Sequence, residues 1–100
     1  MRKVILTPVA RLDLLEIWHF IARDSIDAAD RVTEEIRAAF NGLAVMPGKG
    51  HQRTDVRNPV MRFWSVYSYV IGYRVDDDSL TVVRVIQGNR NFRRLFGRGK

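Results

Sequence analysis

The sequence predicts an α+β domain with an N-terminal strand, an α-hairpin and a three-stranded antiparallel meander, the two helices packing on one face of the sheet. Apolar residues recur at helical spacing up to residue 46 and alternate at strand spacing from residue 61 to residue 87. A chain of 100 residues with 46% hydrophobic content is the size of one domain around one core. We therefore expect a single domain over residues 1–100, of which residues 91–100 form a basic C-terminal tail.

The first strand and the first helix are predicted from the N-terminal residues. Lys3–Leu6 is a short aliphatic and β-branched run that suits an edge or a central strand. Thr7 offers a helix N-cap, and Pro8 occupies the first helical position, where its missing N–H costs nothing. From residue 9 to about residue 23, four large apolar residues fall at helical spacing and define a core stripe: Leu14, Ile17, Trp18 and Ile21.

A second helix is predicted after a break at residues 24–27. Either Ser25 or Asp27 can accept hydrogen bonds from the free amides at the start of that helix. The apolar stripe of this helix continues up to Met46 and comprises Ala29, Val32, Ile36, Phe40 and Leu43. The two helices are therefore expected to form an α-hairpin.

Three strands are expected after a polar loop that starts at Pro47 and reaches residue 59. The strands are predicted at residues 61–66, 68–75 and 80–87. Tight turns are expected near residue 67 and over residues 76–79. Phe63 and Trp64 are adjacent on a strand and must point to opposite faces. We expect the helix-free face of the sheet to be open to a partner, with one of these two aromatics on it.

The charge of the chain indicates an acidic partner, either a nucleic acid or an acidic polypeptide, because the net charge is +6. The charge is also uneven, since no Asp or Glu follows Asp78. The basic residues after that point are Arg84, Arg90, Arg93, Arg94, Arg98 and Lys100. The basic surface is therefore expected at the C-terminal end.

Several classes of protein are excluded by composition. There is no cysteine, so no disulfide framework or thiolate metal site can form. His19 and His51 have no companion at metal-ligand spacing, and we expect no metal and no cofactor. No apolar run approaches the roughly 20 residues of a membrane span, and the N-terminal apolar run stops at Thr7, so we expect a cytoplasmic protein with no membrane partner.

Several short motifs together resemble the ParE branch of the RelE/ParE toxins of bacterial toxin–antitoxin systems. These motifs are Thr7-Pro8, Ala10, Asp13-Leu14, Pro47 to Gly50, Arg62-Phe63, and the run from Arg84 to Asn91. In that run Gln87 and Asn91 stand where the family usually has histidine and aspartate. The resemblance implies a toxin that arrests growth by binding DNA gyrase. It also implies neutralisation by a cognate antitoxin in a higher-order hetero-oligomer.

Two alternatives compete with this interpretation. The ribonuclease branch of the same superfamily cuts mRNA on the ribosome with basic side chains that hold the scissile phosphate and a tyrosine near the C-terminus. In this sequence Arg62 and Arg90 match two of the basic residues of the ribonuclease branch. Tyr69, however, stands where a further arginine is expected, and Phe96 stands where the tyrosine is expected. Phenylalanine cannot move a proton, so we assign no catalytic residue. A basic nucleic-acid-binding module is the other alternative.

Two sets of candidate contact residues follow from the resemblance and from the residue types. For the target we expect contacts from basic side chains on the strands and the tail, namely Arg62, Arg84, Arg90, Arg93 and Arg94. For the antitoxin, which we expect to be ParD-like with an acidic and apolar C-terminal segment, we expect contacts from Trp18, Trp64, Tyr69 and Tyr73.

Overall fold

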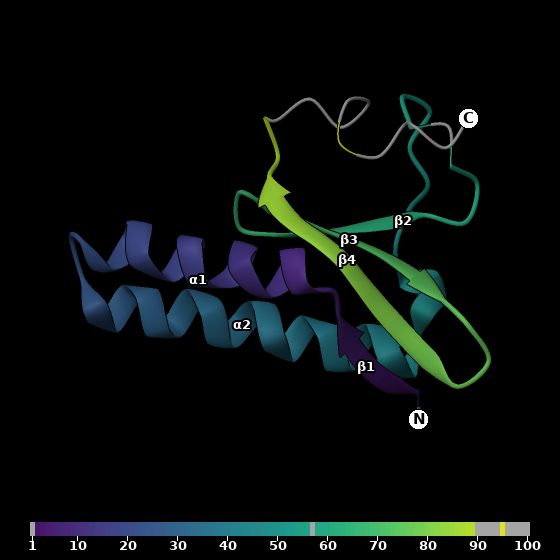
Figure 1. Ribbon diagram of the computed structural model, residues 1–100, viewed down its shortest axis with the longest axis horizontal. Helices are drawn as coiled ribbons and strands as arrows, with labels where there is room; N and C mark the ends of the chain where they lie inside the picture. Colours follow the sequence, from purple (N-terminus) through teal and green to yellow (C-terminus); the bar gives the residue numbers. More distant parts are fainter. Residues whose placement is uncertain (1, 57, 90–94, 96–100) are drawn as a thin grey trace.

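Residues 2–56, 58–89 and 95 are described in a computed structural model of the chain (Figure 1). The elements are β1 (Lys3–Leu6), α1 (Pro8–Ala22), α2 (Ile26–Val45), a short 3₁₀ turn η1 (Pro47–Lys49), β2 (Arg62–Val66), β3 (Tyr69–Val75) and β4 (Ser79–Gln87). The predicted α+β class and the order of its elements are confirmed. Among the described residues no helix is both long and apolar enough to cross a bilayer.

The sheet has the strand order β1-β4-β3-β2. Strands β2, β3 and β4 form the predicted antiparallel meander, whereas β1 pairs with β4 in parallel, with Lys3 opposite Ser79. The sheet is therefore mixed, and β1 lies at its edge. Figure 1 shows both helices on the same side of the sheet, with the tip of the hairpin extending beyond the strands.

Both helices begin at residues whose side chains cap free amides. The Thr7 hydroxyl accepts a hydrogen bond from the Ala10 N–H at 3.1 Å, and Pro8 follows it in the first turn. The Ser25 hydroxyl accepts from the Ala28 N–H at 3.1 Å, so Ser25 rather than Asp27 caps α2. Helix α2 ends at Val45, just before Pro47.

The main core lies between the hairpin and the sheet. From α1 it takes Ala10, Leu14 and Ile17, while Trp18 and Ile21 are only half-buried. The largest fully buried side chains are Tyr73, Ile36, Leu43, Ile71, Leu80, Val82 and Val85. The predicted stripes of both helices thus face this core, with Ile21 packed against it, whereas Trp18 does not belong to it.

A second, smaller cluster covers part of the opposite face of the sheet. It is made of Val56, Met61, Phe63, Val70 and Ile86, with Val83 and Leu95 packed against it. Phe63 is the aromatic on the helix-free face, as the alternation predicted, but it is only 4% exposed. The expectation of an open helix-free face is therefore wrong in this region. Residues of the loop before β2 reach over the sheet there and bury Phe63 (Figure 1).

Tyr73 holds the start of this loop in place. Its hydroxyl donates to the Pro47 carbonyl at 2.6 Å and accepts from the Gly50 N–H at 3.0 Å. A Cβ at Gly50 would overlap the hydroxyl group and ring of Tyr73, so a larger residue there requires Tyr73 to shift. Arg62 donates from Nη1 to the Gly50 carbonyl at 2.8 Å, and His51 pairs with Phe63 in an isolated bridge. Burial raises the pKa of Tyr73 above its usual value.

The predicted turn near residue 67 is present between β2 and β3. Tyr67 has a φ of 56°, in the left-handed region that residues with a Cβ rarely adopt. Its hydroxyl donates to Glu35 Oε2 on α2 at 2.9 Å. This hydrogen bond connects the β2–β3 turn to helix α2.

Candidate functional site: an apolar groove beside the hairpin

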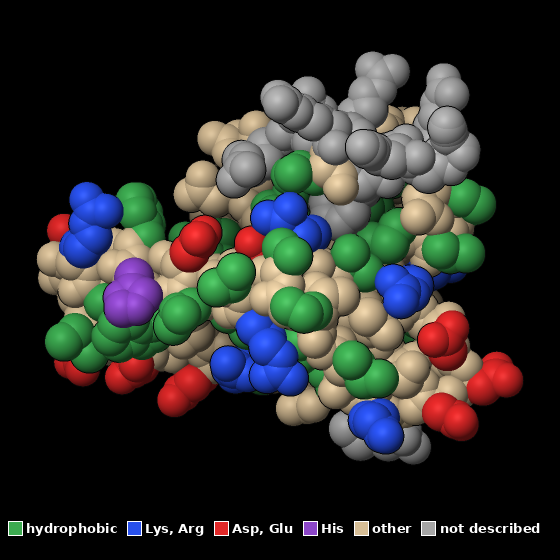
Figure 2. Space-filling model, in the orientation of Figure 1, with side chains coloured by type: hydrophobic (Ala, Val, Ile, Leu, Met, Phe, Trp, Pro, Cys, Tyr) green, Lys and Arg blue, Asp and Glu red, His purple; other side chains and the backbone are tan. Residues whose placement is uncertain are grey.

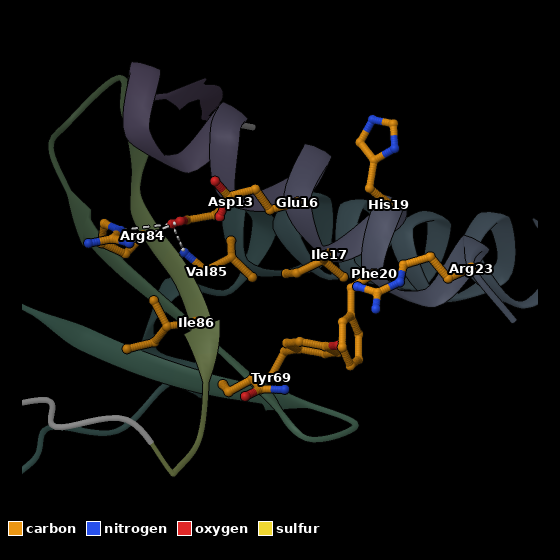
Figure 3. A pocket seen from close by; sticks show the side chains of 11 residues that line it. Asp13, Glu16, Ile17, His19, Phe20, Arg23, Tyr69, Arg84, Val85 and Ile86 are labelled. Carbon is orange, nitrogen blue, oxygen red and sulfur yellow. Dashed lines mark hydrogen bonds and ion pairs between the residues drawn. The ribbon is translucent and has the colours of Figure 1, made fainter.

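A groove of about 580 Å³ lies between α1 and the C-terminal end of β4, next to the start of β3. We call it the inner groove. Its apolar lining comprises Ile17, Phe20, Tyr69, Val85 and Ile86 (Figure 3). Its polar lining comprises Asp13, Glu16, His19, Arg23, Arg84 and Gln87. Apolar side chains that provide contact area, combined with polar groups that can orient a ligand, are the usual make-up of a binding groove.

The Asp13–Arg84 ion pair forms one wall of the inner groove. Arg84 donates from Nε to Asp13 Oδ2 at 2.8 Å and from Nη2 to Oδ1 at 3.0 Å (Figure 3). The same carboxylate accepts the Val85 N–H at 2.9 Å. The hydrogen bonds to Asp13 raise the pKa of Arg84. The two charges of this ion pair cancel, so the wall carries no net charge. The same contacts hold β4 against α1.

The backbone of β4 is irregular at this point. Gly72 on β3 lies opposite Arg84, whereas the next residue, Tyr73, lies opposite Val82. Val83 is consequently the extra residue of a β-bulge, a distortion that re-aims the neighbouring side chains. The carboxylate of Asp13 satisfies the Val85 N–H next to this bulge.

Phe20 is the most exposed apolar side chain of the inner groove. It is 59% exposed, and the Arg23 guanidinium carbon lies 5.7 Å from the centre of its ring. Phe20 lies near the C-terminal end of α1, and the tip of the hairpin that follows it extends beyond the strands (Figure 1). A large aromatic left at the edge of an apolar groove is a typical anchor for a partner.

The four aromatics expected at the antitoxin surface lie in four different places. Tyr69 lines the inner groove, although it is only 6% exposed. Trp18 lies outside this groove, and its indole Nε1–H donates to Asp30 Oδ1 on α2 at 2.8 Å. Tyr73 is fully buried beneath the loop, so its ring offers no contact surface in this conformation.

Trp64, the fourth aromatic, is half-buried at the far edge of the sheet. The Lys49 ammonium lies 4.7 Å from the centre of its ring, and the His51 ring is stacked 6.3 Å away at 20°. Arg62 lies two residues earlier on β2 and donates to the Gly50 carbonyl. We call Lys49, His51, Arg62 and Trp64 the basic corner. The sequence did not indicate that these residues gather, because a loop and a strand contribute them.

The arginines expected at the target surface have structural partners where the structure describes them. Arg62 binds the Gly50 carbonyl, and Arg84 binds Asp13. Each is thus engaged in holding the fold. Arg90, Arg93 and Arg94 lie outside the described residues.

The sequence did not single out several residues that the structure brings to the inner groove, among them Glu16, Phe20 and Arg23. One signal was available for Asp13. It falls at the same helical spacing as the buried residues Ala10, Leu14 and Ile17, and a carboxylate on an apolar stripe requires a buried partner. Within the described residues, no group of three or more His, Cys, Asp or Glu side chains is placed to hold a metal ion.

Comparison with known proteins first identifies the class, which is that of the toxins of type II toxin–antitoxin systems. The family described as "ParE toxin of type II toxin-antitoxin system, parDE" matches residues 4–92. The chain therefore belongs to the ParE toxin family, and the resemblance inferred from the sequence motifs is confirmed.

Two curated relatives come from Caulobacter vibrioides. The chain is 25% identical to "Toxin ParE3" over 99 residues, which is 98% of each chain. It is 27% identical to "Toxin RelE3" over 85 residues, which is 85% of this chain and 92% of that protein. Among solved structures, a chain of the "Chromosomal ParDE TA system from P. aeruginosa" matches with a TM-score of 0.71 and 19% identity, covering 87% of this chain and 96% of the other. At that identity the match supports the fold alone.

Proposed function

We propose that this ParE-family toxin arrests growth by binding DNA gyrase, and that a cognate antitoxin neutralises it by occupying the inner groove. The observation that carries the antitoxin part is the exposed Phe20 beside the apolar floor of the groove. Family membership and the departures from the ribonuclease pattern support the gyrase part.

The antitoxin segment is expected to be amphipathic. The floor residues Ile17, Tyr69 and Val85 are apolar, so burial of apolar surface provides the driving force. The charged residues of the groove are balanced, since Asp13 pairs with Arg84 and Glu16 accompanies Arg23. These charges would therefore set the register of a bound segment, while the net charge of +6 attracts an acidic protein from a distance. We expect the complex to be a higher-order hetero-oligomer in the cytoplasm with a ParD-like antitoxin.

The ribonuclease alternative requires residues that hold a phosphate and transfer protons. Tyr69 occupies the place of one expected arginine, and its 6% exposure leaves it little access to a phosphate. This supports a toxin that acts by binding. The target contacts proposed from the sequence then depend most on Arg90, Arg93 and Arg94, because Arg62 and Arg84 already hold structural partners.

One observation does favour an RNA-directed activity as the second candidate. The basic corner combines Lys49 and His51 with the face of Trp64, a combination of cation and aromatic that suits an anionic, base-bearing ligand. A ribosome-dependent endoribonuclease would use this corner. A gyrase-binding toxin would not require it.

The two candidates are separated by expressing the free chain and mapping the damage. We expect growth arrest with chromosomal DNA damage and no new mRNA ends. Ribosome-dependent cuts within codons, with intact chromosomes, would contradict the proposal. Lys49→Ala and His51→Ala together should leave toxicity unchanged, whereas loss of toxicity in this variant would favour the ribonuclease.

The antitoxin part has its own matched test. Phe20→Asp should weaken antitoxin binding at least tenfold, about 1.4 kcal/mol, while toxicity is retained. Val60→Asp is the control, because Val60 is 60% exposed, about as much as Phe20, but lies on the loop before β2. Equal affinities of the two variants would rule out the inner groove as the antitoxin site.

A further inference from the structure

A second hollow lies where the β2–β3 turn meets the C-terminal end of β4. It has a volume of about 400 Å³, and its lining includes Ser65, Tyr67, Ser68, Val70, Gln87 and Asn89. We call it the turn hollow. Among the described residues it shares only Gln87 with the inner groove, and neither helix contributes to its lining. The turn hollow is therefore separate from the surface of the hairpin.

The described lining of the turn hollow is uncharged. Four of its side chains carry a hydroxyl or an amide group, namely Ser65, Ser68, Gln87 and Asn89. All four are exposed, and none forms a side-chain hydrogen bond with a described residue. Figure 2 shows Asp and Glu side chains gathered over the β3–β4 turn, at the opposite end of β4. A ligand of the turn hollow is therefore expected to be held by neutral hydrogen bonds rather than by charge.

The edge of β2 is open beside the turn hollow. Strand β2 is the last strand of the sheet, and on its outer side Phe63 exchanges two backbone hydrogen bonds of 2.8 Å with His51. In an antiparallel strand every second residue directs its N–H and carbonyl to the same side, so those of Ser65 also face outward. Neither group has a partner among the described residues. This position is therefore free to pair with an added extended segment.

We propose that the turn hollow, together with the open edge of β2, docks an extended segment of the toxin's target protein, for which DNA gyrase is proposed above. The main chain of this segment pairs with Ser65, and the neutral side chains of the hollow bind its next peptide groups. The same edge already accepts an extended residue, His51, at Phe63. Arg90, a proposed target contact, directly follows Asn89 in the sequence. The inference rests on the proposed function, because it assigns a site to the contact with the target.

Two other occupants fit this surface less well. A nucleic acid requires positive charge to hold its phosphates, and the described lining of the hollow carries none. The antitoxin is the other occupant to consider, because Gln87 lines both the inner groove and the turn hollow. The apolar lining of the inner groove, however, suits an amphipathic antitoxin segment better than the uncharged polar lining of the hollow does. An extended peptide of the target uses both the hollow and the open edge.

A pair of glycines provides the main test. Gly88 also lines the turn hollow, and the nearest described atom to a Cβ built there is the Ser68 carbonyl oxygen at 3.4 Å. Its φ lies outside the left-handed region, so Gly88→Leu fills the hollow without rebuilding the backbone. Gly48→Leu is the matched control, because nothing lies within 4 Å of a Cβ at Gly48. Thermal melts of both variants verify that the fold is kept.

We expect Gly88→Leu to bind purified DNA gyrase at least about tenfold more weakly and to lose growth arrest. Its affinity for the antitoxin encoded beside the chain should change less than about twofold, because the inner groove is intact. Gly48→Leu should match the unmodified chain in all three measurements.

The pairing of the edge is tested separately with Ser65→Pro. Proline removes the outward N–H, and an edge strand tolerates this because that N–H makes no bond within the sheet. Ser65→Ala is the control, since it keeps the N–H. We expect Ser65→Pro to bind gyrase at least about tenfold more weakly than Ser65→Ala does. Equal binding of these two variants would refute the pairing with β2. This pair also decides the question if Gly88→Leu melts at a lower temperature than Gly48→Leu.

The outcomes separate this inference from the proposed function. If gyrase binds Gly88→Leu as tightly as the unmodified chain, the turn hollow is refuted as the target site and the proposed function stands. If the unmodified chain does not bind gyrase, the proposed function fails, and growth arrest then decides. Arrest by Gly88→Leu as strong as that by Gly48→Leu would overturn the inference. Weaker binding of Gly88→Leu to the antitoxin, or to a single-stranded DNA oligonucleotide, would assign the hollow to one of the other occupants.

Discussion

Asp13 on α1 holds Arg84 on β4 in two hydrogen bonds of 2.8 and 3.0 Å, and its carboxylate also accepts the Val85 N–H. Asp13 is only 8% exposed, so its charge is compensated inside the protein. The contact connects the helical layer to the sheet and forms one wall of the inner groove. Arg84, which we expected at the target surface, therefore forms part of the wall of the inner groove.

We expect Asp13→Ala to lower the free energy of unfolding by roughly 2–3 kcal/mol, less than a fully buried pair because Arg84 is partly exposed. Asp13→Asn should lose less, since its amide oxygen can still accept the Val85 N–H. Glu16→Ala, an exposed change on the same helix, is the control and should stay within about 0.5 kcal/mol. Chemical denaturation measures all three. Equal stabilities for Asp13→Ala and Glu16→Ala would contradict the structural role of the pair.

Gly50→Ala should destabilise the protein by roughly 2–4 kcal/mol, because a Cβ there collides with Tyr73 and disrupts its hydrogen bonds to the loop. Gly48→Ala is the matched control, since nothing lies within 4 Å of a Cβ at that position. It should leave the stability within about 0.5 kcal/mol. Thermal melts compare the two variants, and similar melting temperatures would show that Tyr73 does not fix the loop.

The stability should fall at alkaline pH through Tyr73. Its pKa is raised by burial above the ordinary value of 10.0, so the unfolded chain loses this proton first as the pH rises. The corresponding stability is fully present below about pH 10 and is lost as the pH rises through the folded-state pKa. Tyr73→Phe should show a shallower alkaline decline in denaturation midpoint, although it is less stable at neutral pH. A decline as steep as that of the unmodified chain would exclude Tyr73 as its source.

Tyr67→Asn should be more stable than Tyr67→Phe by about 1 kcal/mol. Both variants lose the hydrogen bond to Glu35, but asparagine tolerates the left-handed backbone that Tyr67 adopts at a φ of 56°. The comparison thus isolates the backbone strain from the hydrogen bond. Denaturation of the two variants side by side measures the difference. If Tyr67→Asn were the less stable of the two, the turn would not be strained by the tyrosine.

Local sequence signals were sufficient to predict most of the fold. Thr7 and Ser25 cap their helices through short-range bonds, and the helical and strand periodicities set the element order. The parallel pairing of β1 with β4 and the coverage of Phe63 by the loop were not predicted. Both depend on contacts between residues far apart in the chain, which periodicity does not report.

The candidate site was harder to predict for the same reason. Tyr69 and Trp18 were selected by residue type, yet Tyr69 lines the inner groove and Trp18 lies outside it, and Tyr73 was selected in the same way and is buried. Residue type and position in a strand do not determine which surface a side chain reaches. Asp13 shows the converse case, since its place on an apolar stripe predicts a buried partner but does not identify Arg84.

The central claim is that this chain is a toxin that acts by binding DNA gyrase, and that an antitoxin neutralises it. The most direct measurement is the supercoiling of relaxed plasmid by purified DNA gyrase in the presence of the purified chain. We predict that the chain inhibits supercoiling, that adding the antitoxin restores it, and that the antitoxin restores it poorly against Phe20→Asp. Full supercoiling activity at concentrations of the chain that arrest growth in cells would contradict the claim.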